Sequence, residues 1–367
     1  MSARGTVIKR GNTYSVVLDL GRDPDGKRAR RWHSGYRTKK AAEQARTKLL
    51  ADLDAGSYVE PNKLTVGGFI EGQWLPAIRS TVRPTTFAMY EQNAKAHIIP
   101  ALGLGQLRAL APARLNSFYA DMLDNGRKDG KGGLSTRTVR IVHVILHRAL
   151  RDAVRWGLVE RNVADLADPP AVKSKEAAVW SPEQTRAFLA SMADDRLAAL
   201  WRLEASTGMR RGEVCGLRWS DVDLEAGNLR IAQTLVEVNY KLQFSEPKTK
   251  AGKRTLVLDP ATVLALRAHR RRQLEERVAW GPLWTGADAD LVFTKEDGSP
   301  IHPERLSRYF DARVAKAQLP RITFHGLRHS YVTMLQMSDV PFDASFGTVR
   351  DQGAAREIGH DAVGVGA

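Results

Sequence analysis

The chain has 367 residues, enough for two or three domains that each bury a core. Lysine and arginine number 56 against 41 aspartates and glutamates, so the formal charge is +15, and this surplus favours a polyanionic partner. No apolar run approaches a bilayer span, no signal-peptide core opens the chain, and the single Cys215 excludes an internal disulfide. We therefore expect a cytoplasmic protein that binds nucleic acid rather than a membrane.

The first 60 residues predict a small sheet with one helix. Strand-forming runs at 6–8, 14–18 and 27–32 are separated by turn signals, and Thr38 can cap a helix that has one apolar stripe. The third run is basic, with Lys27, Arg28, Arg30 and Arg31. Such a strand can lie in a DNA groove. It can also be a solvated edge strand that prevents aggregation, and both interpretations stay open.

A linker near residues 56–63 leads to a region with helical periodicity. Residues 115–122 have apolar side chains at helical spacing, and a longer helix begins after its predicted cap, Ser135. The longer helix carries four arginines largely away from its apolar face, where they can bind phosphates: Arg137, Arg140, Arg148 and Arg151. His143 and His147 have a spacing that metals use, but the sequence offers no third ligand nearby.

A second linker, 164–178, precedes a region that is mostly helical with a small sheet. Ser181 and Pro182 open a helix with a capping box, and Asp259-Pro260 starts another. Residues 229–238 and 241–244 are predicted as paired strands, with a third strand at 254–258. A further helix is expected at about 302–317.

Three motifs in this last region can carry chemistry. In the stretch 207–219, Arg210 falls at a loop-to-helix junction, a place suited to binding an anion, although a solvated arginine pair (Arg210 and Arg211) explains it too. Residues 247–254 are predicted to form a basic β-hairpin tip that includes Lys248. His325 and Arg328 are three positions apart on a predicted helix, so they share a face.

The order and spacing of these motifs resemble the tyrosine recombinases, the phage-integrase family. The matching pattern is Thr-Gly-x-Arg-x-x-Glu with Leu-Arg-Trp, then a lysine 38 positions after Arg210, then His-x-Leu-Arg-His. The resemblance runs from about Lys63 to Pro341, and more loosely over the N-terminal piece. It implies a mainly α fold with small β-sheets. The implied domains are an arm-binding domain at 1–60, a helical SAM-like core-binding domain at 64–165 and a catalytic domain at 175–367, in which the tail 342–367 is atypical.

The resemblance also implies a metal-free and cofactor-free transesterification at a DNA phosphate. Arg210 and Arg328 are expected to clamp the phosphate oxygens, Lys248 to protonate the leaving 5′ oxygen, and His325 to move a proton or donate to the phosphate. Glu213 is expected to orient Arg210 or the domain core rather than to act in acid–base chemistry, and Lys250 and Lys253 are alternatives to Lys248. His360, in Ile358-Gly359-His360, stands for the next family landmark, further downstream than usual. A zinc site from His325 and His329, or a two-metal nuclease, fits these residues less well.

The family pattern stops before its nucleophile, because no tyrosine follows Tyr331. We interpret 342–367 as a truncated or frame-shifted tail, with a short polar tail as the alternative. The favoured function is a site-specific integrase that binds double-stranded DNA as a homo-oligomer. Whether it is an active enzyme stays open, since the rival from another class is a DNA-binding protein without chemistry. A type IB topoisomerase is less favoured.

Overall fold

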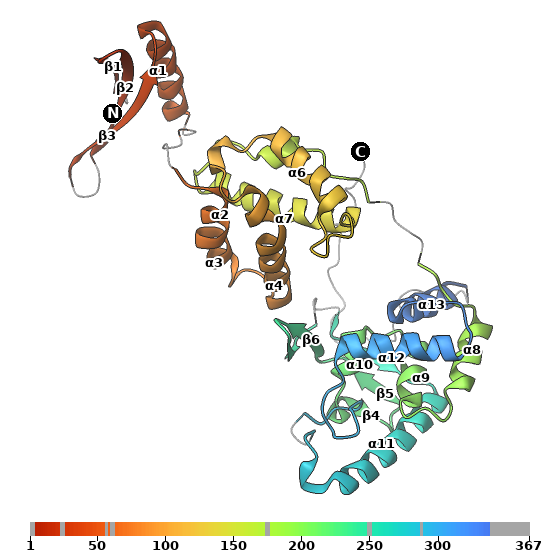
Figure 1. The fold of residues 1–367 in the computed structure, drawn as a ribbon. Coiled ribbons are helices and arrows are strands. Elements are labelled where there is room, and N and C mark those ends of the chain that lie inside the picture. Colours follow the sequence, from red (N-terminus) through yellow and green to blue (C-terminus); the bar gives the residue numbers. More distant parts are fainter. Residues whose placement is uncertain are drawn as a thin grey trace. The chain divides into compact units, whose positions relative to one another are not determined.

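The computed structural model describes residues 4–22, 26–55, 58, 63–172, 177–247, 252–286 and 289–337. The chain divides into two units, Met1–Ser174 and Lys175–Ala367 (Figure 1). Within the described residues, no helix has the length and apolar character needed to cross a bilayer. The predicted fold class is confirmed: the helices dominate, with a three-stranded sheet at the N-terminus, a helical domain and a mixed third domain.

The N-terminal part is an antiparallel sheet covered by one helix. Its elements are β1 (Arg4–Arg10), β2 (Thr13–Arg22), β3 (Arg28–Tyr36) and α1 (Lys39–Asp54), with strand order β1-β2-β3. The Thr38 hydroxyl caps α1 by accepting from the Ala41 backbone N–H, as predicted. Val16 and Leu18 are fully buried with Ala42 of α1. On the basic strand, Trp32 stays 44% exposed, and the Arg10 guanidinium lies 4.7 Å from the centroid of its ring.

The rest of the first unit is a bundle of helices with its own core. Its helices are α2 (Val66–Phe69), α3 (Leu75–Ile78), α4 (Pro84–Asn93), α5 (Ile99–Leu102), α6 (Pro112–Asn125) and α7 (Thr136–Arg155), with π-helical segments at Ile70–Trp74 and Ala94–Ile98. Ser135 caps α7, as predicted. His143 and His147 hold protein partners here: His143 Nδ1 lies 2.9 Å from the Tyr119 hydroxyl, and His147 Nε2 lies 2.7 Å from Asp165.

The exposed side of α7 is an arginine stripe, which we define as Arg137, Arg140, Arg148, Arg151 and Arg155. Their spacings of 3, 8, 3 and 4 positions are close to whole turns of a helix, so they lie along one face of α7. Arg148 is partly committed, because it donates to the Tyr90 hydroxyl, and Arg155 pairs with Asp152. Val144, half exposed, interrupts the stripe at its centre. The face is therefore cationic along most of the helix.

The second unit is built around α9. Its helices are α8 (Pro182–Ser191), α9 (Ala198–Thr207), α10 (Arg211–Cys215), α11 (Pro260–Trp280), α12 (Pro303–Lys316) and α13 (Phe324–Met337). Helix α9 packs against α11 on one side and α13 on the other (Figure 1). Trp201 of α9 forms an aromatic cluster with Phe188 and Phe310 at the centre of the core. The helix that carries His325 and Arg328 is thereby held against the helix that ends just before Arg210.

The strands of this unit differ from the prediction. They are β4 (Val222–Asp223), β5 (Asn228–Arg230), β6 (Thr234–Val238), β7 (Lys241–Ser245) and β8 (Thr255–Val257). The single strand predicted at 229–238 is two strands in different sheets, since β5 lies between β4 and β8 while β6 pairs only with β7. The prediction of a hairpin tip at 247–254 is also wrong in its flanks, because β7 and β8 do not pair with each other. The buried residue Ile231 lies between β5 and β6, where the predicted strand is interrupted.

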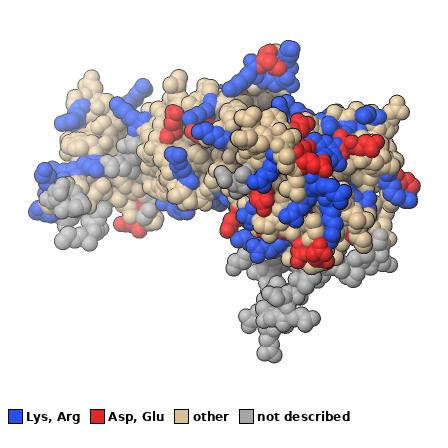
Figure 2. Space-filling model, turned by 90° about the horizontal axis from the view of Figure 1, so that it is seen from below, with Lys and Arg blue, Asp and Glu red and all other residues tan. Residues whose placement is uncertain are grey.

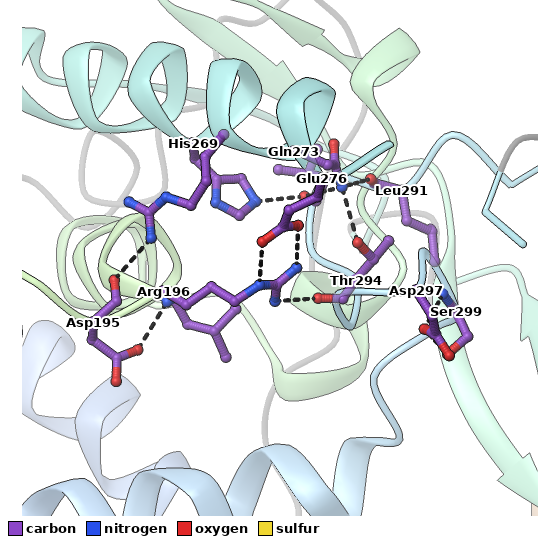
Figure 3. A network of polar contacts seen from close by, with 12 residues as sticks. Asp195, Arg196, His269, Gln273, Glu276, Leu291, Thr294, Asp297 and Ser299 are labelled. Carbon is purple, nitrogen blue, oxygen red and sulfur yellow. Dashed lines mark hydrogen bonds and ion pairs between the residues drawn. The ribbon is translucent and has the colours of Figure 1, made fainter. Parts of the chain in front are cut away.

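A polar network fastens the start of α9 to α11 (Figure 3). Nε and Nη2 of Arg196 each donate to an oxygen of the Glu276 carboxylate at 2.6 Å, and Nη1 donates to the Thr294 carbonyl at 2.7 Å. Asp195, the preceding residue, pairs with Arg313 of α12. The Arg196 and Glu276 side chains are mostly buried. Arg196 thereby joins the segment before α9, helix α11 and the segment at Thr294, which lie far apart in the sequence.

We expect Arg196→Ala to destabilise the second unit by about 2–3 kcal/mol, because it leaves a largely buried carboxylate and a carbonyl without their donor. Chemical denaturation followed by tryptophan fluorescence measures this. The control is Arg186→Ala, which removes a solvent-exposed pair with Glu183 and should cost at most about 1 kcal/mol. Equal losses for the two variants would contradict the assigned role of Arg196.

Candidate active site

The candidate site begins where α9 ends. Gly208 closes the helix in the left-handed conformation, with φ +56°, which favours glycine. A Cβ atom built on Gly208 would also lie 2.5 Å from the Tyr331 ring of α13. The chain can therefore turn tightly here and pass directly under α13. Arg210 follows two residues later as the N-cap residue of α10, the loop-to-helix position that was predicted.

Arg210 is oriented by Glu213, as the sequence suggested. The Glu213 carboxylate accepts from the Arg210 backbone N–H and from its Nη1, both at 2.8 Å. The Arg210 side chain nevertheless stays 56% exposed, so its guanidinium is fixed at one end and open to solvent at the other. An arginine held in this way can donate to an incoming oxyanion without a large loss of side-chain entropy.

Glu213 also binds a second arginine, which the sequence did not indicate. Arg254 donates from Nη1 and Nη2 to the two Glu213 oxygens at 3.3 and 3.1 Å, and only 6% of its side chain is exposed. Arg254 was predicted to lie at a basic hairpin tip, and it is instead a buried partner of Glu213. Burial alone would raise the pKa of Glu213, but hydrogen bonds and charge from Arg254, with hydrogen bonds from Arg210, lower it below its usual value.

Helix α13 brings the other motif to the same place. Arg328 Nη1 donates to the carbonyl of Gly208, so this guanidinium reaches the turn that precedes Arg210. The His325 and His329 rings, one turn apart, meet edge to face with centroids 4.7 Å apart. Partial burial lowers the pKa of His325, and His329, Arg328, Arg210 and Arg211 lower it further. The structure thus places His325 within the field of both arginines that the resemblance named.

The balance of charge at this turn favours an anion. Three guanidiniums, those of Arg210, Arg254 and Arg328, meet two acidic side chains, Glu204 and Glu213. Burial and the neighbouring cations Arg210 and Arg254 lower the pKa of Arg328. Glu213 and Glu204 oppose this effect. Because an arginine keeps its proton in a protein, a negatively charged partner would offset this unfavourable environment of the cation.

Not all of the predicted site residues are among the described residues. Lys248, Lys250 and His360 lie outside the described residues, as do the tail residues Ser345 and Thr348. Lys253 pairs with Glu246 at 3.1 Å on the surface. No group of three potential metal-binding side chains occurs in the part of the chain that the structure describes. Sequence reasoning missed Arg254, Glu204 and the Tyr331–Gly208 contact. No periodicity or motif in the sequence predicts that Arg254 and Glu204 belong to this site.

Three family models match the chain in the predicted order. The Arm DNA-binding domain matches residues 7–53, the phage integrase N-terminal SAM-like domain 71–123, and the Phage integrase family 180–344. A "Tyrosine recombinase XerC-like" protein of Caldanaerobacter subterraneus subsp. tengcongensis is 27% identical over 359 residues, which cover 93% of this chain and 90% of that protein. An integrase of Streptomyces ambofaciens is 27% identical over 349 residues, with 93% and 87% covered.

Two kinds of solved structure share the fold. The Tn1549 transposon integrase, in complex with a circular intermediate DNA, has a TM-score of 0.64 at 22% identity, covering 77% of this chain and 90% of that one. Lambda integrase, as a tetramer bound to a Holliday junction, has a TM-score of 0.56 at 16% identity, with 93% and 94% covered. Taken with the three family models, the motifs and the arginine-rich turn lead to one assignment: the chain belongs to the phage integrase family of tyrosine recombinases.

Proposed function

We propose that the chain is a site-specific DNA recombinase in which Arg210 and Arg328, the arginine clamp, hold the reacting phosphate. The convergence of the two arginines on one turn carries this proposal: Arg328 contacts the carbonyl of Gly208, and Arg210 begins the helix two residues later. Two guanidiniums can donate to the non-bridging oxygens and offset the charge that grows in the transition state. The cations needed at the phosphate are therefore side chains of this chain.

The proposed proton transfers rest on the resemblance and, for His325, on its place one turn before Arg328 on α13. In the reaction, an attacking hydroxyl forms a bond to phosphorus while the bond from phosphorus to the 5′ oxygen breaks, and that oxygen takes a proton. Lys248 is the proposed donor of this proton. His325, with its lowered pKa, is largely neutral at pH 7, so it can accept the proton of the attacking hydroxyl or donate to the phosphate.

The attacking hydroxyl is the part that the described residues do not provide. Tyr331 is the last tyrosine of the sequence, and its half-buried ring packs against Gly208. Burial raises the pKa of Tyr331, against the lowering effect of Arg254 and Arg328, so this phenol is a poor nucleophile. We therefore propose that the 367-residue chain binds DNA without forming a covalent adduct. This observation also favours the second candidate, a DNA-binding protein without chemistry.

Double-stranded DNA is the proposed partner, and the cationic surface supports it. Lysine and arginine side chains outnumber acidic ones over the visible face of the molecule (Figure 2). Basic side chains line one face of helix α7, as the arginine stripe, and the strand β3. An α-helix and a β-ribbon are the two elements that fit into the major groove of DNA. Because lambda integrase is seen as a dimer on a core site and as a tetramer on a Holliday junction, we propose a homo-oligomer on DNA here too.

Binding to duplex DNA should weaken steeply as salt rises, because each arginine that neutralises a phosphate releases counterions. The logarithm of the association constant should fall linearly with the logarithm of the salt concentration, with a slope of about −0.9 per phosphate contact. Replacing Arg137, Arg140 and Arg151 together by alanine should make the slope shallower by about 3. Fluorescence anisotropy with a labelled duplex measures both.

Arg186→Ala is the matched control, since this exposed arginine of α8 already pairs with Glu183. A flat salt response of the unaltered chain would contradict the proposed function. An unchanged slope in the triple variant would remove α7 from the DNA-binding surface. Relaxation of a supercoiled plasmid without a specific site would instead favour the topoisomerase alternative.

A further inference from the structure

One buried acid near the arginine clamp has no assigned role. Glu204 lies on the inner face of α9 and is 0% exposed. No hydrogen bond from the described residues reaches either oxygen of its carboxyl group. Its backbone carbonyl accepts from the N–H of Gly208 at 2.8 Å, so Glu204 stands one helical turn before the carbonyl that Arg328 contacts. A buried polar group without partners is costly, and its persistence at this turn needs a reason.

The charged and titratable groups around Glu204 come from three segments. The charges of Arg328 on α13, Glu213 on α10 and Arg254 before β8 act on Glu204, and Glu204 in turn acts on the buried Cys215 thiol of α10; helix α13 packs against α9. On the α11 side of α9, the Asp259 carboxylate is committed to Thr262 and Arg202. Burial raises the pKa of Glu204 well above its usual value; Arg328 and Arg254 oppose this rise, and Glu213 adds to it.

We propose that Glu204 is a positioning residue for Arg328, which it faces as an uncharged carboxylic acid. The inference rests on the proposed function, because it concerns how much of the Arg328 charge reaches the DNA phosphate. An ionised carboxylate in this low-dielectric place would pair with Arg328 and compete with the phosphate for its guanidinium. A neutral acid fills the same space and adds no negative charge that competes with the phosphate for Arg328.

The two neighbouring glutamates thus have opposite tasks. Glu213 accepts four hydrogen bonds from Arg210 and Arg254, which only a carboxylate does well. Glu204 accepts none from the described residues. Replacing each by glutamine, which has nearly the same shape but no charge, therefore separates them: the change should be tolerated at Glu204 and should destabilise the protein at Glu213.

The first test uses the pH dependence of unfolding and needs no ligand. If Glu204 is protonated in the folded chain and ionised in the unfolded one, folding takes up a proton, so stability falls as pH rises through the window between the two pKa values. The unfolding constant of the unaltered chain should then rise relative to that of Glu204→Gln by up to about tenfold per pH unit in this window.

Glu213→Gln is the matched control for this test. Its folded pKa lies below the unfolded one, so its stabilising effect is complete above the usual glutamate pKa, and its difference from the unaltered chain should not change with pH there. A difference between the unaltered chain and Glu204→Gln that is likewise independent of pH would overturn the proposal. Should Glu204→Gln fail to fold, Glu204→Met takes its place, because no hydrogen bond to a described residue is lost.

The second test asks whether the neutral acid serves the clamp, with inorganic sulfate as the probe. Sulfate has phosphate-like geometry and keeps its charge over the pH range. Sulfate also stabilises proteins by general salting-out, which should be the same in the unaltered chain and in Arg328→Ala. The difference in sulfate stabilisation between these two chains is therefore the part due to the clamp. This clamp-specific part should shrink in the unaltered chain as pH rises through the upper end of the window found in the first test, where the folded chain loses the Glu204 proton, and should persist in Glu204→Gln.

The outcomes separate the two claims. No difference between the unaltered chain and Arg328→Ala at any pH would contradict the arginine clamp itself, and with it the proposed function. A clamp-specific effect that weakens equally with pH in the unaltered chain and in Glu204→Gln would leave the clamp standing and overturn the role of Glu204.

Discussion

Replacing Glu213 by alanine is expected to destabilise the catalytic domain by about 3–5 kcal/mol, the range for removing one partner of a buried ion pair. The reason is Arg254, whose guanidinium is almost fully buried and donates to both oxygens of Glu213. Without the carboxylate, that charge stays in the core with no acidic partner of comparable geometry. A loss of this size is a large part of the total stability of an ordinary domain, commonly 5–15 kcal/mol. Chemical denaturation at neutral pH measures it.

The control is Glu225→Ala, which removes a glutamate that pairs with Arg267 at the surface, where its side chain is 86% exposed. We expect at most about 1 kcal/mol there. The effect of Glu213 should also depend on acid in a defined direction. Because its pKa is lowered in the folded chain, its contribution is present above the usual glutamate pKa and is lost as pH falls through the folded value. A Glu213→Ala variant as stable as Glu225→Ala would refute the buried pair.

Local signals in the sequence predicted the helices well. Thr38, Ser135, Ser181 and Asp259 each cap the helix that was expected after them. Capping depends on a side chain and a backbone N–H only two or three residues away, so the information lies within a single stretch of sequence. The same holds for Arg210 at the start of α10 and for His325 and Arg328 on one helix face.

Strand pairing was predicted less well, because it depends on partners far along the chain. Residues 229–238 were predicted as one strand, but β5 pairs with β8 and β6 pairs with β7. Two glycines explain part of this arrangement. A Cβ atom on Gly212 would lie within 2.8 Å of atoms of Thr234 and Leu235, and one on Gly216 would lie 2.8 Å from the Leu235 nitrogen, so the α10 region packs directly against the backbone of β6. No sequence pattern near residue 234 predicts that contact.

The candidate site was predicted in part for the same reason. The motif residues Arg210, His325 and Arg328 were identified from short patterns, and the structure brings Arg328 to the turn that precedes Arg210, with His325 one turn earlier on α13. Arg254 and Glu204 belong to the site through burial and charge, which arise only when α9, α10 and α13 pack together. Lys248 and His360 stay predictions, as they lie outside the described residues.

The second large effect concerns covalent chemistry. In the proposed function the arginine clamp and His325 stabilise charge and move protons, but a covalent step also needs an attacking hydroxyl. No tyrosine follows Tyr331 in the 367 residues, and the aliphatic hydroxyls of Ser345 and Thr348 ionise less readily than a phenol. We expect the unaltered chain to bind DNA and form no 3′-phosphoprotein adduct. A chain whose residues after Pro341 are read from another frame, and include a tyrosine, should form it. In that chain Arg210→Ala should slow adduct formation by about 10²–10³-fold.

The measurement that decides this is adduct trapping on nicked suicide substrates, read as a denaturant-resistant protein–DNA band. We expect a DNA-bound species in native gels and no such band for the unaltered 367-residue chain. A resistant band from that chain, abolished by Arg210→Ala, would contradict the account, because it would require a nucleophile among residues to which we assign none.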